Sequence, residues 1–236
     1  MRYVFRPPPS TALGNQLAAQ TRRIAQKRTQ ATRCKAADTN WKNAGKVRLM
    51  HELIAMNRGH DRCMYCEYSE AGTVDHFNPK SVEPLLCFEW GNLVLACGRC
   101  QAAKLANFSP DLLNPSDPAY RPWYHLEFEP SSGEYVAAAP RGTASATIYK
   151  WGRGKLPEYR RKSFRVFQAA IIAYAVSVSS GDLAQSVYQR EIAVAESHPG
   201  VLDWIIYWAD GGDPHGYLDP RCVAAVIAHP EIRTWC

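Results

Sequence analysis

The chain has 236 residues and a formal net charge of +6, and 46% of its residues are hydrophobic. It is therefore long enough for one large domain or two modest ones, and it can bury a core. No apolar run of about 18 residues occurs, which argues against a membrane span. The first residues also lack the apolar stretch of a secretory signal. We therefore expect a cytoplasmic protein with no membrane association.

Charge is distributed unevenly along the chain. Residues 1–50 carry eleven Lys and Arg residues and one acidic residue, a net charge of +10, whereas residues 51–236 carry a net charge of −4. A basic arm suits a polyanion because each neutralised phosphate releases counterions. A solvated helix face has the same composition, so this alternative stays open. The residues of the arm expected to contact nucleic acid are Arg22, Arg23, Lys27 and Arg28.

The N-terminal part of the chain is expected to be helical. Ser10 or Thr11 can cap a helix after an extended proline run, because apolar residues then recur at helical spacing. A second helix is predicted from about residue 40 to residue 57. From residue 59 to about residue 107 the chain becomes irregular and rich in cysteine, which indicates a segment organised by something other than a large apolar core.

The remainder of the chain alternates between a loop, a hairpin and helices. A Pro- and Asp-rich loop precedes two predicted strands, at 124–128 and 134–138, and helices are predicted over 157–179 and 182–197, followed by two short apolar helices. The predicted fold class is α+β and mainly helical. The predicted divisions are a basic helical region at 1–58, a core at 59–107, a loop and hairpin at 108–156, and a helical region at 157–236.

Two C-x-x-C motifs, CMYC and CGRC, stand thirty residues apart. Each motif turns two thiolates toward one point, and four thiolates satisfy a tetrahedral Zn²⁺ with no open position. An iron–sulfur cluster is the alternative metal site, whereas a redox dithiol would not explain why there are two motifs. We predict a structural zinc that supplies folding free energy. Its ligands would be Cys63, Cys66, Cys97 and Cys100. Buried apolar or bystander roles are expected for Cys34, Cys87, Cys222 and Cys236.

The segment between the two motifs carries an acid and a histidine side by side. Strands predicted at 73–77 and 92–96, followed by a helix from Gly98, form a β-β-α unit. The motifs CMYC, DHFNP, NL and CGRCQAAK occur in that order over residues 63–104. This order resembles the zinc-stapled members of the HNH endonuclease family. Over residues 50–165 there is a looser resemblance: the segments DHFNPKS, FEWGNLVLAC and LLNPSDP are similar to those of the HNH nuclease subunit of Septu-type and retron-type anti-phage systems.

The resemblance implies a ββα-metal (HNH) nuclease core with a four-cysteine zinc site, flanked by N- and C-terminal helices. It implies a metal-dependent endonuclease that hydrolyses DNA, as the effector of a bacterial defence system with an ATPase partner. His76 would be the general base, Asp75 a ligand of a catalytic Mg²⁺ or Mn²⁺, and Asn92 the residue that braces the loop carrying the base. These residue types suit the chemistry, since a neutral imidazole can accept a proton and a carboxylate can hold a hard cation.

Gln101 departs from the family pattern, which has Asn or His at this position. Its longer side chain can coordinate the metal in a shifted geometry, coordinate it through water, or leave it uncoordinated. Lys80 and Lys104 would face phosphate, although an ordinary solvated lysine suits Lys104 equally well. The alternative function is a zinc-stabilised nucleic-acid-binding module or complex adaptor with a degenerate, inactive site.

Overall fold

The computed structural model describes residues 1–57, 61–68, 70–196, 198–213 and 215–235, and the fold is α+β and mainly helical with two small sheets. The chain divides into two compact units. The first unit comprises Met1, Tyr3–Arg121 and Pro140–Lys150, and the second comprises Arg2, Pro122–Ala139 and Trp151–Cys236. No described helix is long and apolar enough to cross a bilayer.

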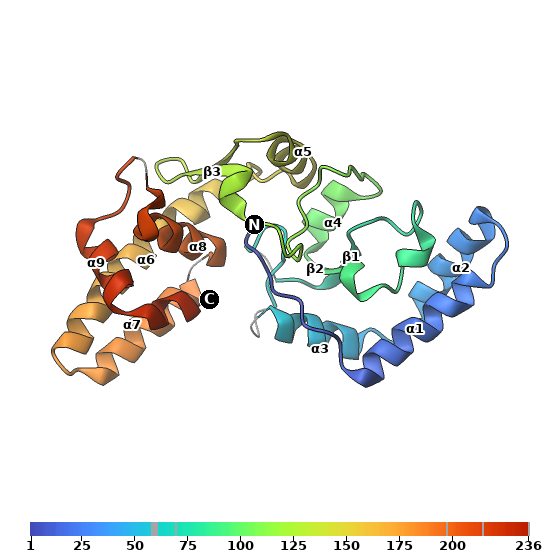
Figure 1. The fold of residues 1–236 in the computed structure, drawn as a ribbon, viewed down its shortest axis with the longest axis horizontal. Coiled ribbons are helices and arrows are strands. Elements are labelled where there is room, and N and C mark those ends of the chain that lie inside the picture. The colour runs from blue at the N-terminus through green and yellow to red at the C-terminus, as the bar shows by residue number, and fades with distance from the viewer. Residues whose placement is uncertain (58–60, 69, 197, 214, 236) are drawn as a thin grey trace. The chain divides into compact units, whose positions relative to one another are not determined.

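The first unit begins with three helices, α1 (Thr11–Ala25), α2 (Gln30–Asn43) and α3 (Val47–Met56). The Ser10 side chain accepts a hydrogen bond from the backbone of the first turn of α1, and Thr29 forms a capping box at α2. The expected single helix over 40–57 is instead divided, because Ala44 is extended and interrupts it. Helices α1 and α2 lie side by side (Figure 1).

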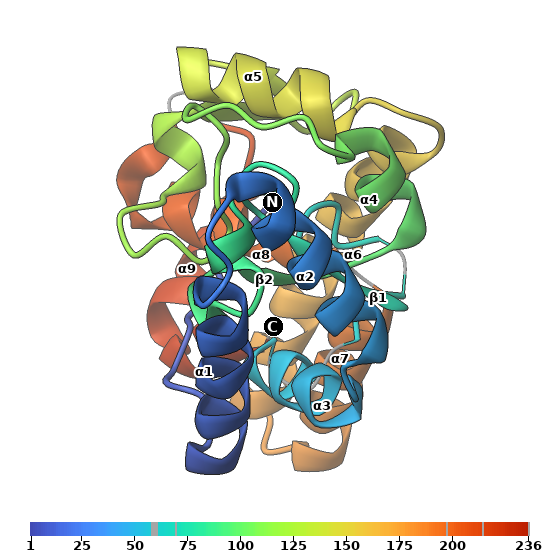
Figure 2. The ribbon, with the colours of Figure 1, turned by 90° about the vertical axis from the view of Figure 1, so that its right-hand side faces the viewer.

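Two short strands and a helix follow in the first unit. Strand β1 (Thr73–His76) pairs antiparallel with β2 (Leu93–Ala96), with His76 opposite Leu93. Short 3₁₀ turns at Pro84–Leu86 and Trp90–Asn92 precede β2, and α4 (Gly98–Lys104) follows it. The β1–β2 hairpin lies between α3 and α4 (Figures 1 and 2). The structure therefore has the β-β-α order expected from the sequence.

Helix α5 (Pro140–Tyr149) completes the first unit and was not expected from the sequence. It packs against α4. Its last residue, Tyr149, is buried and stacks on Tyr65 with ring centroids 4.5 Å apart. A segment from the predicted loop-and-hairpin region thus helps to enclose the cysteine-bearing part of the chain.

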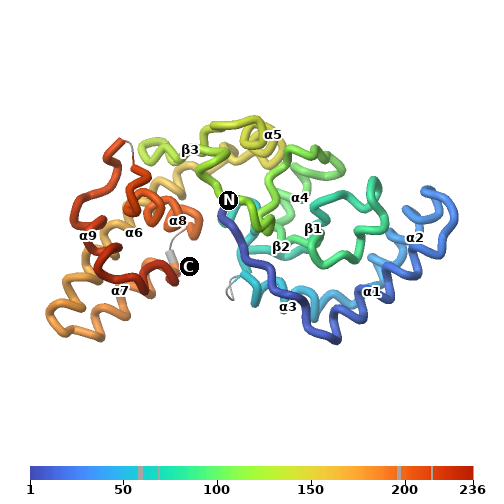
Figure 3. Tube along the Cα trace, in the orientation of Figure 1, coloured from blue at the N-terminus to red at the C-terminus, as the bar shows by residue number. Residues whose placement is uncertain are grey.

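The second unit combines a hairpin with helices. Strands β3 (Leu126–Glu129) and β4 (Glu134–Ala137) pair antiparallel. Their turn requires Gly133, whose φ is +79°, because a Cβ there would lie 1.8 Å from the carbonyl oxygen of Pro157. The helices form a pair of long elements, α6 and α7, followed by shorter ones (Figure 3). Their bounds are α6 Leu156–Ser179, α7 Leu183–Glu196, α8 Pro199–Tyr207 and α9 Pro220–Ala228, with a π turn at Trp208–Gly212 and 3₁₀ turns at Pro122–Tyr124 and Pro230–Thr234.

Candidate functional site

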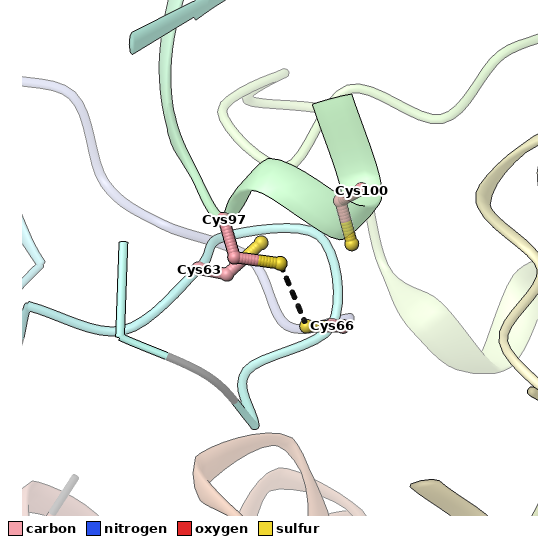
Figure 4. A group of neighbouring side chains, drawn as sticks. All are labelled: Cys63, Cys66, Cys97 and Cys100. Atoms are coloured by element: carbon pink, nitrogen blue, oxygen red, sulfur yellow. Dashed lines mark hydrogen bonds between the residues drawn. The ribbon is translucent and has the colours of Figure 1, made fainter. Parts of the chain in front are cut away.

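The four cysteines of the two C-x-x-C motifs form one buried cluster. Their sulfurs all lie within 4.8 Å of one another and face a common centre (Figure 4). The Sγ atoms of Cys66 and Cys97 are 3.9 Å apart. A tetrahedral zinc with Zn–S bonds of about 2.3 Å separates its sulfurs by about 3.8 Å. The cluster can therefore hold a metal ion such as zinc, as the spacing of the motifs predicts.

The local structure of the cluster ties it to the hairpin. The amide of Met64 donates to the carbonyl of Leu95 in β2 at 2.9 Å, and Cys97 is the N-cap residue of α4. A hydrogen bond with Cys100 lowers the pKa of Cys66 to about 7, and a bond with the same residue is the largest cause of the lowered pKa of Cys97. Burial raises the pKa of Cys63, and the pKa of Cys100 is also raised, because the lowering effect of its hydrogen bond with Cys63 is outweighed by its hydrogen bonds with Cys66 and Cys97. A metal ligand must be a thiolate, so binding of an ion would deprotonate the cluster.

Asp75 is buried on β1 and is paired with an equally buried lysine. Its Oδ2 accepts a hydrogen bond from the Tyr65 hydroxyl at 2.9 Å and lies 3.1 Å from Nζ of Lys104. Burial raises the pKa of Asp75, and the Lys104 ammonium opposes that rise. Nζ of Lys104 also donates to the His76 carbonyl at 2.7 Å. The negative charge of Asp75 is thus compensated inside the protein.

The ring of His76 is held in one orientation. Its Nε2 lies 3.0 Å from the carbonyl oxygen of Cys87, which can only accept a hydrogen bond, so we assign the ring proton to Nε2 and leave Nδ1 as an acceptor. Burial lowers the pKa of His76 to about 4, so the ring is neutral at pH 7. Trp41 of α2 packs edge-on against the ring, with centroids 4.3 Å apart. Burial also raises the pKa of Cys87 to about 12, so this thiol is not a nucleophile.

Asn92 joins the segments on either side of the turn after β1. Its Oδ1 accepts from the Asn78 amide at 2.6 Å, and its Nδ2 donates to the carbonyls of Asn78 and Leu86 at 3.0 and 2.9 Å. The side chain is only 3% exposed. These three bonds join the loop that follows His76 to the segment before β2.

Asp75, His76 and Gln101 border one cavity of about 360 Å³ in the first unit, together with Lys80 and Trp41. A second cavity of about 310 Å³ shares Gln101 and Trp41 with it. The Gln101 amide nitrogen lies 3.4 Å from the carbonyl of Val74. The fold therefore brings Asp75, His76, Lys80 and Gln101 to one cavity and adds Trp41 of α2, which the motif order did not predict.

The basic residues expected to contact nucleic acid differ in their exposure and in their position relative to the cavity. Lys104 is fully buried rather than facing solvent, because it neutralises Asp75. Lys80 lies at the cavity, with Nζ 3.1 Å from Asp38 of α2. The four residues of the basic arm are exposed at the C-terminal end of α1 and the turn after it, and they do not line the cavity: Arg22, Arg23, Lys27 and Arg28.

Sequence reasoning missed three residues that shape the site: Tyr65, Trp41 and Cys87. Tyr65 lies between the cysteines of the first motif, where its position beside the predicted metal was an available signal. Among the other cysteines, Cys222 is buried and Cys34 is half-buried, in keeping with their expected apolar or bystander roles, and Cys236 lies outside the described residues. Cys87 is buried as expected but also contacts the His76 ring.

Comparison with protein-family models, with curated proteins and with solved structures found no match to this chain.

Proposed function

We propose that this protein is a metal-dependent endonuclease of the HNH type that hydrolyses phosphodiester bonds in DNA. The observation that carries the proposal is the state of His76, a neutral imidazole fixed through Nε2 beside a carboxylate and bordering a cavity. The order of the cysteine, Asp-His and Asn motifs supports the same interpretation. The β1–β2–α4 unit would then be a ββα-metal core, and the cysteine cluster would hold its structural zinc.

The reaction needs a water molecule, a base and positive charge near the phosphate. His76 can accept the proton of the water at Nδ1, because Nε2 already carries a hydrogen that is bonded to Cys87. Lys80 and Gln101 border the same cavity and would contact phosphate oxygens there. The chain's own groups would thus orient the substrate and remove the proton.

Asp75 and Gln101 offer the oxygen donors that Mg²⁺ or Mn²⁺ prefers. Bound there, such an ion would stabilise negative charge on the phosphate and on the leaving oxygen. Lys104 lies 3.1 Å from Oδ2 of Asp75, so an ion at this carboxylate would share it with the ammonium. The donor chemistry therefore fits a divalent ion in the presence of an internal cation.

We extend the proposal to the partners that the resemblance implies. The exposed basic end of α1 supplies positive charge for DNA. A nuclease that cut DNA freely would harm its host, so we propose restraint by an ATPase partner in an anti-phage defence complex. Copurification of an ATPase with the tagged full chain is the expected result. Vigorous plasmid cleavage by the isolated protein with metal alone would contradict the restraint.

One observation favours a second function, a zinc-stabilised nucleic-acid-binding module without catalysis. Lys104 already neutralises Asp75 inside the protein, and a site with this charge balance is stable without a divalent ion. In that case the basic arm would bind nucleic acid, and the cavity at His76 would not turn over substrate.

Cleavage of supercoiled plasmid separates the two functions. The wild type, with its ATPase partner and with Mg²⁺ or Mn²⁺, is expected to produce nicked or linear DNA, and His76→Ala is expected to lower the rate by about 10²-fold or more. His51→Ala is the matched control, because His51 is exposed on α3 and does not line the cavity. If the wild type binds plasmid but cleaves no faster than His76→Ala, the binding module is the correct function.

A further inference from the structure

An aromatic pocket of about 190 Å³ lies within the second unit, among β3, α8 and the segments beside them. None of its lining residues belongs to the candidate site of the first unit. Six of its lining residues carry aromatic rings: Trp123, Phe128, Trp204, Tyr207, Trp208 and Tyr217.

The rings present walls in more than one orientation. Trp123 and Tyr207 are stacked, with centroids 4.4 Å apart and planes 4° from parallel. Trp204 stands nearly perpendicular to both, at 76° and 80°. The face of an aromatic ring carries negative electrostatic potential, so a cation in this pocket would be attracted to whichever ring faces it contacts.

Two carboxylates add formal negative charge to the pocket. Glu127 and Glu129 of β3 both line it. Oε1 of Glu129 accepts from the hydroxyl of Ser131 at 2.8 Å, and Oε2 accepts from the hydroxyl of Tyr217 at 3.2 Å. These bonds hold the carboxylate in place, and those from Ser131 are the largest cause of its lowered pKa. The described lining residues include no Lys or Arg, and His215 is the lining side chain among them that can carry positive charge.

We propose that this pocket binds a small organic cation of the methylated ammonium class. The aromatic walls suit the apolar, positively charged methyl groups, and the carboxylates complement the charge. A neutral apolar ligand would gain from burial against the rings but nothing from Glu127 and Glu129. The site is independent of the nuclease proposal, because it shares no residue with the cavity at His76.

Isothermal titration of the full chain with choline and with its neutral carbon isostere, 3,3-dimethylbutan-1-ol, tests the proposal. Choline is expected to bind at least about tenfold more tightly than the isostere. Glu129→Gln should weaken choline about three- to tenfold without affecting the isostere, since only the charge is removed. The control Glu191→Gln changes an exposed carboxylate of α7 outside the pocket and should leave both affinities unchanged.

A second variant, Trp123→Leu, removes one ring that is only half-buried. It should abolish the preference for choline while the circular dichroism spectrum stays that of the wild type. Equal binding of choline and the isostere by the wild type would overturn the cation assignment. Absence of choline binding at millimolar concentration, or binding that survives both substitutions, would overturn the site.

Discussion

The first unit buries charged and polar side chains beside one cavity, whereas the interior of the second unit contains a group of aromatic rings packed among aliphatic side chains. Asp75, His76, Asn92 and Lys104 of the first unit are each less than a tenth exposed. In the second unit, Phe128 stacks on Trp208 with centroids 5.9 Å apart, and Phe164 meets the same ring edge-on. The buried Arg160 of the second unit donates to two backbone carbonyls.

This difference in buried ionisable groups is one reason to propose the nuclease site in the first unit. Burial of ionisable groups costs free energy unless each is paired, and proteins accept that cost most often at functional sites. The first unit offsets it with the Asp75–Lys104 pair and with a cysteine cluster that can hold zinc. The core of the second unit is largely apolar and also encloses Arg160 and His198.

Removal of the metal should produce the largest difference in hydrogen-exchange protection between the two units. A structural zinc contributes on the order of 10 kcal/mol to the folding of a small domain. A chelator, or Cys97→Ser, should therefore expose β1 and β2 to hydrogen exchange while α6 and α7 keep their protection. Cys34→Ser is the control, since Cys34 is half-buried and outside the cluster. Unchanged protection of β1 and β2 after removal of the metal would contradict this account.

Loss of the buried ammonium should have the next largest effect. Lys104→Met leaves the Asp75 carboxylate buried without its cation and should destabilise the first unit by about 3–5 kcal/mol. Added Mg²⁺ should then raise the melting temperature of the variant more than that of the wild type. Lys80→Met, at a partly exposed ion pair with Asp38, should cost less than about 1 kcal/mol. Equal stability of the two variants in urea would show that Lys104 does not compensate Asp75.

Substitution of the bracing asparagine tests the polar network itself. Asn92→Ala removes three hydrogen bonds, so the backbone groups of Asn78 and Leu86 lose the side chain that bonds them. The expected loss is about 2–3 kcal/mol, measured as faster hydrogen exchange in the first unit only. Asn107→Ala changes an exposed residue and should be neutral. An equal effect of the two substitutions would contradict a bracing role.

The residues that were predicted correctly and those that were not differ in how local their signals are. The cysteine cluster could be predicted because C-x-x-C spacing fixes the geometry of each pair of sulfurs. The burial of Lys104 could not be predicted, because its partner Asp75 lies 29 positions earlier in the sequence. The segment QAAK alone does not distinguish a buried lysine from a solvated one. Helix α5 was missed because its sequence, PRGTASATIY, has only weak apolar periodicity. The aromatic pocket has no linear motif, since its residues come from 123 to 217.

Charge reversal should distinguish the surfaces of the two units. Arg22→Glu with Arg23→Glu on α1 should weaken DNA binding about tenfold and reduce the salt slope by about 2, since each lost phosphate contact contributes about 0.9. Arg161→Glu with Arg165→Glu on α6 makes the same change in net charge on exposed residues of the second unit. Fluorescence anisotropy at several salt concentrations measures both. Equal weakening by the two double variants would show that only net charge matters.

The smallest expected effect concerns an ion pair in the second unit. Arg233 donates to both carboxylate oxygens of Asp210 at 2.6 and 2.7 Å and lowers the pKa of Asp210. A lowered pKa in the folded state means that the pair stabilises the protein above about pH 4, and that this contribution is lost as the pH falls further. Because both side chains are partly exposed, Arg233→Gln should cost at most about 1 kcal/mol at pH 7. A cost in thermal melts that is larger at pH 3 than at pH 7 would contradict this sign.

The central claim is that the metal-bound first unit holds His76 as a neutral base with its proton on Nε2. Long-range ¹H–¹⁵N NMR of the histidine-labelled protein measures this directly, with His76→Gln assigning the signal. At pH 7 we predict a neutral ring with a protonated Nε2 and an unprotonated Nδ1, and loss of this signal when the metal is removed. A charged ring, a proton on Nδ1, or a signal that is unchanged by chelation would contradict the claim.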